Sequence, residues 1–268
     1  MSAALEFLYR VLALLALALA IRVVVDVWLE TPYSILLILV GVGISILPID
    51  VGLRLSHDVI MSLVLPLILF NGAIELNRRV LRENIVVPLV LVVVGIPLAV
   101  ALLGAATAAV FGLPVLIALL LAGIVVPTDP VAVLSLFEEI DAPERLSVII
   151  DSESLFNDGV AVVIVNVLLV LIAERPTPTG GSEIATTVVI DLIVVGVGGF
   201  LIGAVLGYTA TQFIRRVPER MAILLSTVLV AYGSYVLATS VVGVSGILAT
   251  VGAGLFIETT ASEGIEID

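Results

Sequence analysis

The stretch that decides the fold is PVLIALLLAGIVVPTDPVAVLSLF, residues 114–137. It is apolar except around a central Pro-Thr-Asp-Pro, and it is long enough to cross a hydrocarbon core, which takes about 20 residues. The rest of the chain has the same character: 61% of its 268 residues are hydrophobic, 13% are charged, and the mean hydropathy is +1.33. Water-soluble packing cannot absorb that much apolar surface. The sequence therefore predicts an all-α, polytopic membrane protein.

Similar apolar runs lie on both sides of this stretch. Together they predict about nine transmembrane helices in a single membrane domain, residues 1–268, with one helix interrupted at residues 127–130. Glycine and proline inside the runs are compatible with this, because neighbouring helices can satisfy the freed backbone groups. The runs are residues 5–21, 32–47, 59–76, 85–110, 114–137, 146–173, 186–214, 221–240 and 244–257.

The arginines predict how the chain crosses the cell membrane, since basic residues are enriched in cytoplasmic loops. The connections after the first, third, fifth and seventh runs hold most of the arginines, which predicts an amino terminus outside the cell. The residues on that predicted cytoplasmic side are Arg22, Arg78, Arg79, Arg82, Arg145, Arg215, Arg216 and Arg220, and those on the other side are Arg10, Arg54 and Arg175.

Composition also excludes several classes of function. The chain has no cysteine, which excludes disulfides, zinc–thiolate sites and thiol catalysis. Its formal net charge is −12, so it lacks the basic footprint that nucleic acid requires. The lipid bilayer is the partner that the composition predicts.

The break inside the quoted stretch is the first candidate site. Pro127 and Pro130 flank Thr128 and Asp129 and remove two backbone donors, which disrupts a helix. An interrupted helix at membrane depth exposes carbonyl oxygens and helix ends, which many transporters use as ion sites. A proline kink with a hydrogen-bonded Asp129 is the alternative.

The second candidate site is DSESLFND, residues 151–158, at the start of the sixth run. Residues three and four apart share a helix face, so Asp151, Ser154 and Asp158 form one stripe with Asn157 beside it. An ionised Asp at bilayer depth costs at least ~2.5–3.5 kcal/mol, which marks it as a functional candidate. Carboxylate, hydroxyl and amide oxygens suit a hard cation such as Na⁺. Asp151 and Glu153 have an alternative role as first-turn acids complementing the helix dipole.

Other polar residues give weaker signals. Asn71 and Glu75 lie four apart and so can face the same cavity, although Glu75 could equally be an interfacial residue beside the following arginines. We expect Asp191 near a membrane surface and His57 in a solvated loop. The glycines of the seventh run have small-xxx-small spacing, which predicts a helix-packing face. They are Gly196, Gly198, Gly199, Gly203 and Gly207.

Two motifs together carry a resemblance to a known family. Thr128-Asp129-Pro130, followed by ESLFNDG at residues 153–159, resembles the cation/proton antiporter-1 family of sodium/proton exchangers, and within it the NhaP-like prokaryotic type. The resemblance implies about 13 helices in two inverted repeats, a homodimer, and alternating access. It implies no cofactor, with Na⁺ (or Li⁺ or K⁺) and H⁺ as the transported ions.

The resemblance also implies the roles of individual residues. Asp158 would bind Na⁺ and H⁺ alternately, and an Asn157–Asp158 pair resembles the electroneutral branch, which exchanges one Na⁺ for one H⁺. Asn157 would brace the site, which the remaining residues complete. These are Asp129, Ser154, Glu153 and the backbone of Thr128.

Two features depart from the family pattern. Asn71 stands where relatives often carry an acid, and Glu75, one turn further on, could substitute for it. The sequence also stops before the second broken helix, so that residues 1–268 correspond to the first repeat and the start of the second. A non-transporting fragment that needs a partner is therefore an alternative. An intramembrane aspartyl protease is a further one, although its Gly-Asp motif does not occur in this sequence.

Overall fold

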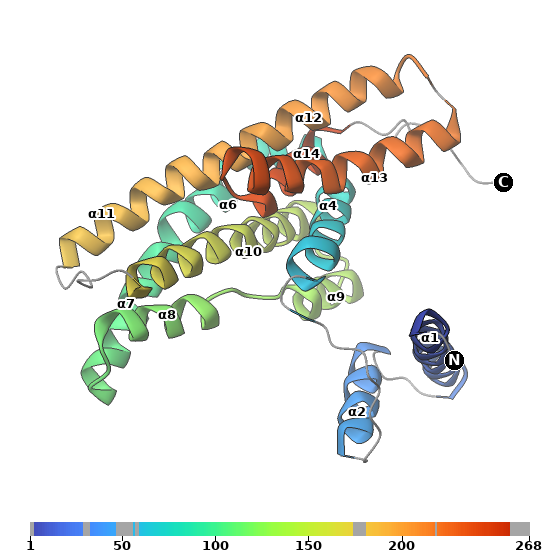
Figure 1. Cartoon of the computed structure of the whole chain (residues 1–268), viewed down its shortest axis with the longest axis horizontal. Helices are drawn as coiled ribbons and strands as arrows, with labels where there is room; N and C mark the ends of the chain where they lie inside the picture. Colours follow the sequence, from blue (N-terminus) through green and yellow to red (C-terminus); the bar gives the residue numbers. More distant parts are fainter. Residues whose placement is uncertain are drawn as a thin grey trace. The chain divides into compact units, whose positions relative to one another are not determined.

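The computed structural model describes residues 3–28, 33–46, 56, 59–173, 181–217 and 219–257. All secondary structure within these ranges is helical, as the sequence predicts. The chain divides into two compact units, residues 1–57 and 58–268. Figure 1 shows the helices of both units.

The first unit contains two apolar helices, α1 (Ala3–Trp28) and α2 (Tyr33–Ile46). The Tyr33 hydroxyl donates a hydrogen bond to the backbone oxygen of Ala18 at 3.3 Å. The Arg22 guanidinium lies 5.5 Å from the centre of the Tyr33 ring, in the range of a cation–π contact. These contacts join the first residue of α2 to α1. His57, for which the sequence predicts a solvated loop, lies outside the described residues.

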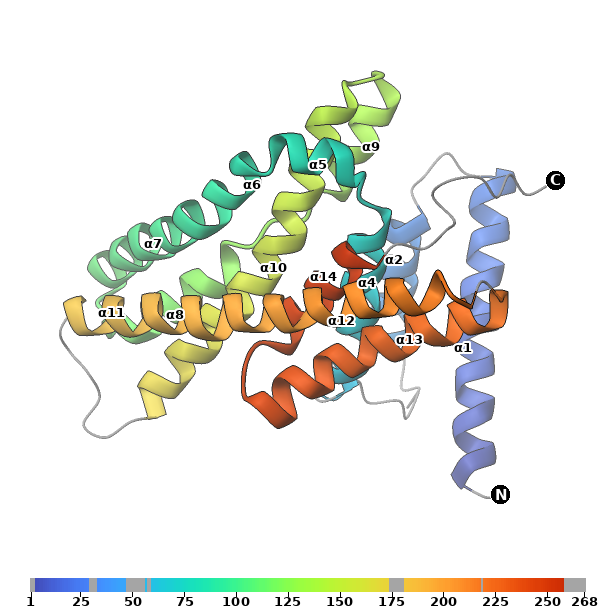
Figure 2. The ribbon, with the colours of Figure 1, turned by 90° about the horizontal axis from the view of Figure 1, so that it is seen from above.

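The second unit contains the remaining helices, several of which are continuous with short π-helical segments. They are η1 (Ile60–Val64), α4 (Leu65–Glu75), α5 (Arg78–Asn84), α6 (Val86–Val90), η2 (Leu91–Gly95), α7 (Ile96–Phe111), α8 (Val115–Val125), α9 (Val131–Glu139), α10 (Glu144–Ala173), α11 (Gly181–Asp191), η3 (Leu192–Val197), α12 (Gly198–Ile214), α13 (Arg220–Val236), η4 (Leu237–Val242) and α14 (Gly246–Phe256). Figure 2 shows α10 running through the middle of this unit, where it contacts α4, α8 and α14.

Among the described residues, the apolar runs largely coincide with a helix or with a continuous series of helices, except that residues 114–137 are divided between α8 and α9. Within the described ranges, four helices are long and apolar enough to cross a membrane, and a fifth is obtained if the bent pair Ile60–Glu75 and Arg78–Asn84 is one span. The four are Val86–Phe111, Glu144–Ala173, Ile184–Ile214 and Arg220–Val242. The chain is thus a polytopic α-helical membrane protein, while the count of nine spans stays a prediction.

The interruption predicted at Pro127–Pro130 is present. Helix α8 ends at Val125 and α9 begins at Val131, and the residues between them are not helical. Neither proline can donate a backbone hydrogen bond, and each disfavours helical geometry in the residue before it. Figure 1 shows the extended connection between α8 and α9.

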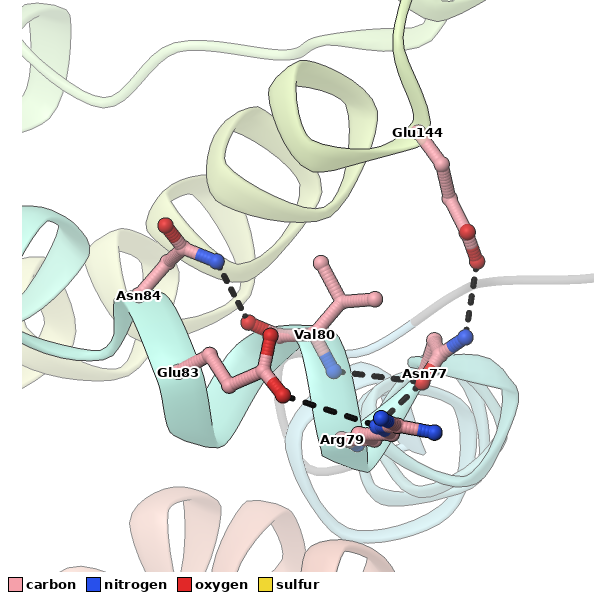
Figure 3. A network of polar contacts seen from close by, with 6 residues as sticks. All are labelled: Asn77, Arg79, Val80, Glu83, Asn84 and Glu144. Atoms are coloured by element: carbon pink, nitrogen blue, oxygen red, sulfur yellow. Dashed lines mark hydrogen bonds and ion pairs between the residues drawn. The ribbon is translucent and has the colours of Figure 1, made fainter.

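The connection after the third apolar run contains a further helix, α5, which begins three residues after the end of α4 and changes the direction of the chain. The two helices meet at 85°. The Asn77 side-chain oxygen caps α5 by accepting from the backbone N–H groups of Arg79 (3.1 Å) and Val80 (3.3 Å). Its amide nitrogen donates to Glu144 at 2.7 Å, as Figure 3 shows. Since Glu144 is the first residue of α10, this network ties the corner to the amino terminus of α10.

Three of the five glycines of the seventh run form a packing face as predicted, and their partner is α14 together with Ser245, which caps it. A Cβ at Gly203 would overlap the backbone oxygen of Ala249, and one at Gly199 or Gly207 would overlap that of Ser245 or Ala253. The four-residue spacing on both helices brings one glycine to each carbonyl. Helices α12 and α14 therefore pack backbone against backbone, which side chains at these positions would prevent.

Candidate functional site

The break between α8 and α9 presents polar groups in an extended segment. Thr128 and Asp129 are exposed among the described residues, while Pro127 and Pro130 are half-buried. The Asp129 Oδ1 atom accepts a hydrogen bond from the backbone N–H of Val131 at 3.0 Å. Asp129 thus caps the first turn of α9, as the kink alternative expected, and its carboxylate stays exposed for further contacts.

Helix α10 holds the break through Thr128. The buried hydroxyl of Ser154 donates to the Thr128 backbone oxygen at 3.0 Å. The amide nitrogen of Asn157 donates to the Thr128 hydroxyl at 3.3 Å. Because Ser154 and Asn157 are three apart, both reach the break from one helix face. The two motifs singled out in the sequence are therefore in direct contact.

Two carboxyl groups of α10 accompany this contact. Asp158 is half-buried, and its carboxyl lies close enough to those of Asp129 and Glu153 to interact with them electrostatically. Asp158 thus interacts with one acid of the break and with one acid of its own helix. Mutual repulsion of carboxylates favours the uptake of a cation or a proton.

Asn157 contributes a buried oxygen without a partner. Its side chain is fully buried, and its Oδ1 atom has no hydrogen-bond partner among the described residues. A buried polar atom left unsatisfied costs about 1–3 kcal/mol. Amide oxygens are ligands of hard cations. Asn157 thus bonds to Thr128 through its amide nitrogen, while its Oδ1 atom is available as a ligand, and its bracing role stays a prediction.

Asn71 and Glu75 lie one turn apart on α4. They share a face of α4, where the Asn71 amide nitrogen donates to Glu75 Oε1 at 2.6 Å. The carboxyl group of Glu75 interacts electrostatically with that of Asp151. A pocket of about 220 Å³ is lined by both acids together with Glu144 and Ser147. Glu75 therefore meets the amino-terminal part of α10.

Glu144 and Ser147 are two further polar residues of α10 that line this pocket and that the two motifs do not include. They lie seven and four residues before Asp151 and so extend backwards the helix stripe that contains Asp151 and Asp158. That periodicity was the signal for them. Asp191 is half-buried at the end of α11 and lies apart from these residues in the sequence.

The described residues include no group of three or more His, Asp or Glu side chains arranged to hold a metal ion. The oxygens at the break are instead of mixed type: the Thr128 carbonyl and hydroxyl, the Ser154 hydroxyl, and nearby carboxylates. A cation bound there would be held by a few carboxylates together with neutral oxygens.

Comparison with known proteins points to one family. A family model described as "Sodium/hydrogen exchanger, transmembrane" matches residues 11–266. The Na⁺/H⁺ antiporter ApNhaP of Aphanothece halophytica is 35% identical over 234 residues, which are 85% of this chain and 42% of that protein. The low-affinity Na⁺/H⁺ antiporter NhaS1 of Synechocystis is 34% identical over 238 residues, with the same two shares.

A third relative gives the same picture. The Na⁺/H⁺ antiporter NhaH of Halobacillus dabanensis is 31% identical over 254 residues, 91% of this chain and 62% of that protein. The chain therefore spans about four to six tenths of the length of these relatives. Since the family model covers nearly the whole sequence, the chain belongs to the sodium/hydrogen exchanger family.

Proposed function

We propose that this chain carries the ion site of a secondary transporter that exchanges Na⁺ for H⁺ across the cell membrane. The observation that carries the proposal is the contact of Ser154 and Asn157 with Thr128, beside the half-buried carboxyl of Asp158. The relatives are named Na⁺/H⁺ antiporters, which supports the same activity here. Its direct partners would be the lipid bilayer and the two ions, with no cofactor.

Asp158 is the proposed carrier of both ions. A carboxylate at bilayer depth is expensive unless a cation or a proton neutralises it. In the Na⁺-bound state, Asp158, Asp129 and Glu153 supply negative charge. The hydroxyl of Ser154 and the backbone oxygen of Thr128 supply neutral ligands, since a carbonyl that accepts one hydrogen bond keeps a second lone pair. In the other state, a proton on Asp158 replaces Na⁺.

The proposed stoichiometry is one Na⁺ for one H⁺. Asn157, beside Asp158, bears an amide that neither gains nor loses a proton in this pH range, so the pair offers one titratable group. Exchange of one charge for one charge at that group is electroneutral. Alternating access of the site to the two membrane faces, with Li⁺ or K⁺ as alternative cargoes, belongs to the same proposal.

The proposal also covers the arrangement of the chain in the membrane. Residues 1–268 would form one membrane domain, which comprises the first repeat and the start of the second. The amino terminus would lie outside the cell, and the assembled form would be a homodimer.

A second candidate is a fragment that transports only with a partner. It is favoured by the exposure of Thr128 and Asp129 and by the 42% share of two relatives that the chain spans. Membership of the exchanger family disfavours the aspartyl protease.

Proton flux into sealed vesicles tests the proposal. Two proteins are reconstituted: this chain, and a chimaera in which it replaces the aligned part of the Aphanothece halophytica antiporter. A Na⁺ gradient directed out of the vesicles should drive proton uptake into vesicles that contain the chimaera. Asp158→Asn should abolish this uptake without preventing membrane insertion, because the amide cannot bind a proton. Asp191→Asn is the matched control, which should retain exchange.

The outcomes separate the candidates. Exchange by the chimaera alone supports the fragment that needs a partner, and exchange by both proteins supports a self-sufficient transporter. Unchanged exchange in the Asp158→Asn chimaera would exclude Asp158 as the carrier.

A further inference from the structure

A pocket of about 710 Å³, a typical volume for a ligand site, lies where α5, α10, α12 and α14 meet. Its lining includes both arginine and phenylalanine side chains. We infer that this pocket binds an anionic phospholipid, with the phosphate on the arginines and the upper acyl chains against the phenylalanines. The inference concerns lipid binding alone and does not depend on the proposed exchange activity.

Three arginines line the pocket. Arg78 and Arg82 lie one turn apart on α5, and Arg215 directly follows the last residue of α12. The Arg78 guanidinium donates to the backbone oxygens of Gly254 (3.4 Å) and Ile257 at the carboxyl end of α14, which fixes the position of its charge. In a chain with a net charge of −12 and 11 basic residues, three arginines around one pocket are complementary to an anion.

Three phenylalanines also line the pocket, each from a different helix. Phe156 of α10 and Phe200 of α12 have ring centres 6.3 Å apart, and Phe200 is equally distant from Phe256 of α14. Both pairs meet edge to face, an arrangement that stabilises aromatic packing. A small inorganic anion would gain no binding energy from these rings, whereas an amphipathic ligand would bury its hydrocarbon against them.

The position of the pocket along the membrane-spanning helices selects a lipid as this amphipathic ligand. Arg215 follows the end of the span Ile184–Ile214, at the level where head groups lie. Tyr208, an aromatic residue of the type found at membrane interfaces, also lines the pocket. Guanidinium groups bind phosphate in a bidentate manner. All three arginines fall on the predicted cytoplasmic side, and anionic lipids give the cytoplasmic leaflet its negative surface potential.

Native mass spectrometry of the purified 268-residue protein in detergent micelles tests the inference. Phosphatidylglycerol and phosphatidylcholine with identical acyl chains are titrated separately. The wild-type protein should retain phosphatidylglycerol at concentrations where phosphatidylcholine dissociates. The variant Arg82→Ala/Arg215→Ala should weaken phosphatidylglycerol binding by roughly 30-fold, at about fivefold for each basic residue near an anionic lipid.

Arg79→Ala/Arg216→Ala is the matched control. It removes the same two charges from neighbouring positions that do not line the pocket, and it should change binding little. The charge-retaining variant Arg82→Lys/Arg215→Lys should lose less affinity than the alanine variant, because it keeps the charge and loses only the bidentate geometry. This comparison separates loss of charge from loss of fold.

Three results would overturn the inference. The first is equal retention of the two lipids by the wild-type protein. The second is an equal loss in the pocket variant and the control variant, which would indicate diffuse surface attraction. The third is complete displacement of phosphatidylglycerol by glycerol 1-phosphate at matched concentration, which would indicate a site for small anions.

Discussion

Thr128 joins the two parts of the candidate site, the break between α8 and α9 and the polar face of α10. Its backbone oxygen accepts from Ser154 and its hydroxyl accepts from Asn157, so that α10 fixes both the conformation and the position of the break. The buried Ser152, two residues before Ser154, donates instead to carbonyls of its own helix, those of Val148 (2.6 Å) and Ile149 (3.0 Å). Ser154 therefore connects α10 to the break, whereas Ser152 bonds only within α10.

Ser154→Ala should weaken Na⁺ binding, and Ser152→Ala should not. The first change removes a hydrogen bond worth ~1 kcal/mol and a ligand hydroxyl, which should raise the Michaelis constant for Na⁺ by roughly fivefold. The second removes only bonds within one helix turn. The measurement is the Na⁺ dependence of exchange by the chimaera, and equal Michaelis constants in the two variants would exclude a role for Ser154 at the site.

At the same scale, the sequence predicts some site residues and not others. The stripe of Asp151, Ser154 and Asp158 follows from helical spacing alone, and an acid at bilayer depth identifies itself by its cost. The contact between Thr128 and Asn157 joins residues 29 apart and requires the tertiary structure. Glu75 likewise meets Asp151 through the packing of α4 against α10, which no local pattern indicates.

Among the elements, the broken helix was predictable and the bent one was not. Pro127 and Pro130 separate α8 from α9, because proline has no backbone N–H and its ring clashes with the preceding helix turn. The 85° corner between α4 and α5 depends on Asn77, whose side chain caps α5 while bonding to Glu144 of a distant helix. Glycine spacing on α12 predicts a close approach, but nothing in that spacing identifies α14 as the partner.

Gly203→Ala should destabilise the protein, and Gly233→Ala should not. A Cβ at Gly203 meets the backbone oxygen of Ala249, so that α12 and α14 must separate, and overpacking of this kind costs typically 1–3 kcal/mol. A Cβ at Gly233 of α13 meets nothing within 4 Å, and alanine is the better helix former. Thermal unfolding in detergent measures both. A Gly203→Ala melting temperature equal to that of Gly233→Ala would contradict the close packing.

For the whole molecule, hydropathy predicts the class and does not determine the number of spans. The apolar runs can be read from the composition of the sequence. In the described part of the chain, however, only four helices, or five with the bent pair, are both long enough and apolar enough to cross a membrane. Helices such as Val115–Val125 and Gly246–Phe256 are too short alone. Whether a short helix spans depends on the partners that cover its ends, and its own sequence does not contain that information.

Electroneutral exchange is a property of the whole molecule and predicts insensitivity to voltage. One Na⁺ against one H⁺ moves no net charge, so a membrane potential, worth ~2.3 kcal/mol per charge per 100 mV, cannot drive the cycle. Exchange by the chimaera should therefore proceed at the same rate and to the same equilibrium when a potassium diffusion potential is imposed with valinomycin. A shift of the equilibrium Na⁺ gradient with the imposed potential would contradict the one-for-one stoichiometry.

Proton release on Na⁺ binding tests most directly whether one carboxylate, Asp158, serves both ions. Na⁺ and H⁺ that compete for one site are linked reciprocally, so added Na⁺ expels protons, and acidification raises the apparent dissociation constant for Na⁺. The purified chain, weakly buffered in detergent, should release protons when Na⁺ is added, and the Na⁺ concentration for half-maximal release should rise as the pH falls. Asp158→Asn should abolish the release and Asp191→Asn should retain it. Undiminished release from the Asp158→Asn protein, or a half-maximal Na⁺ concentration that stays constant across two pH units, would show that Na⁺ and H⁺ bind at separate sites.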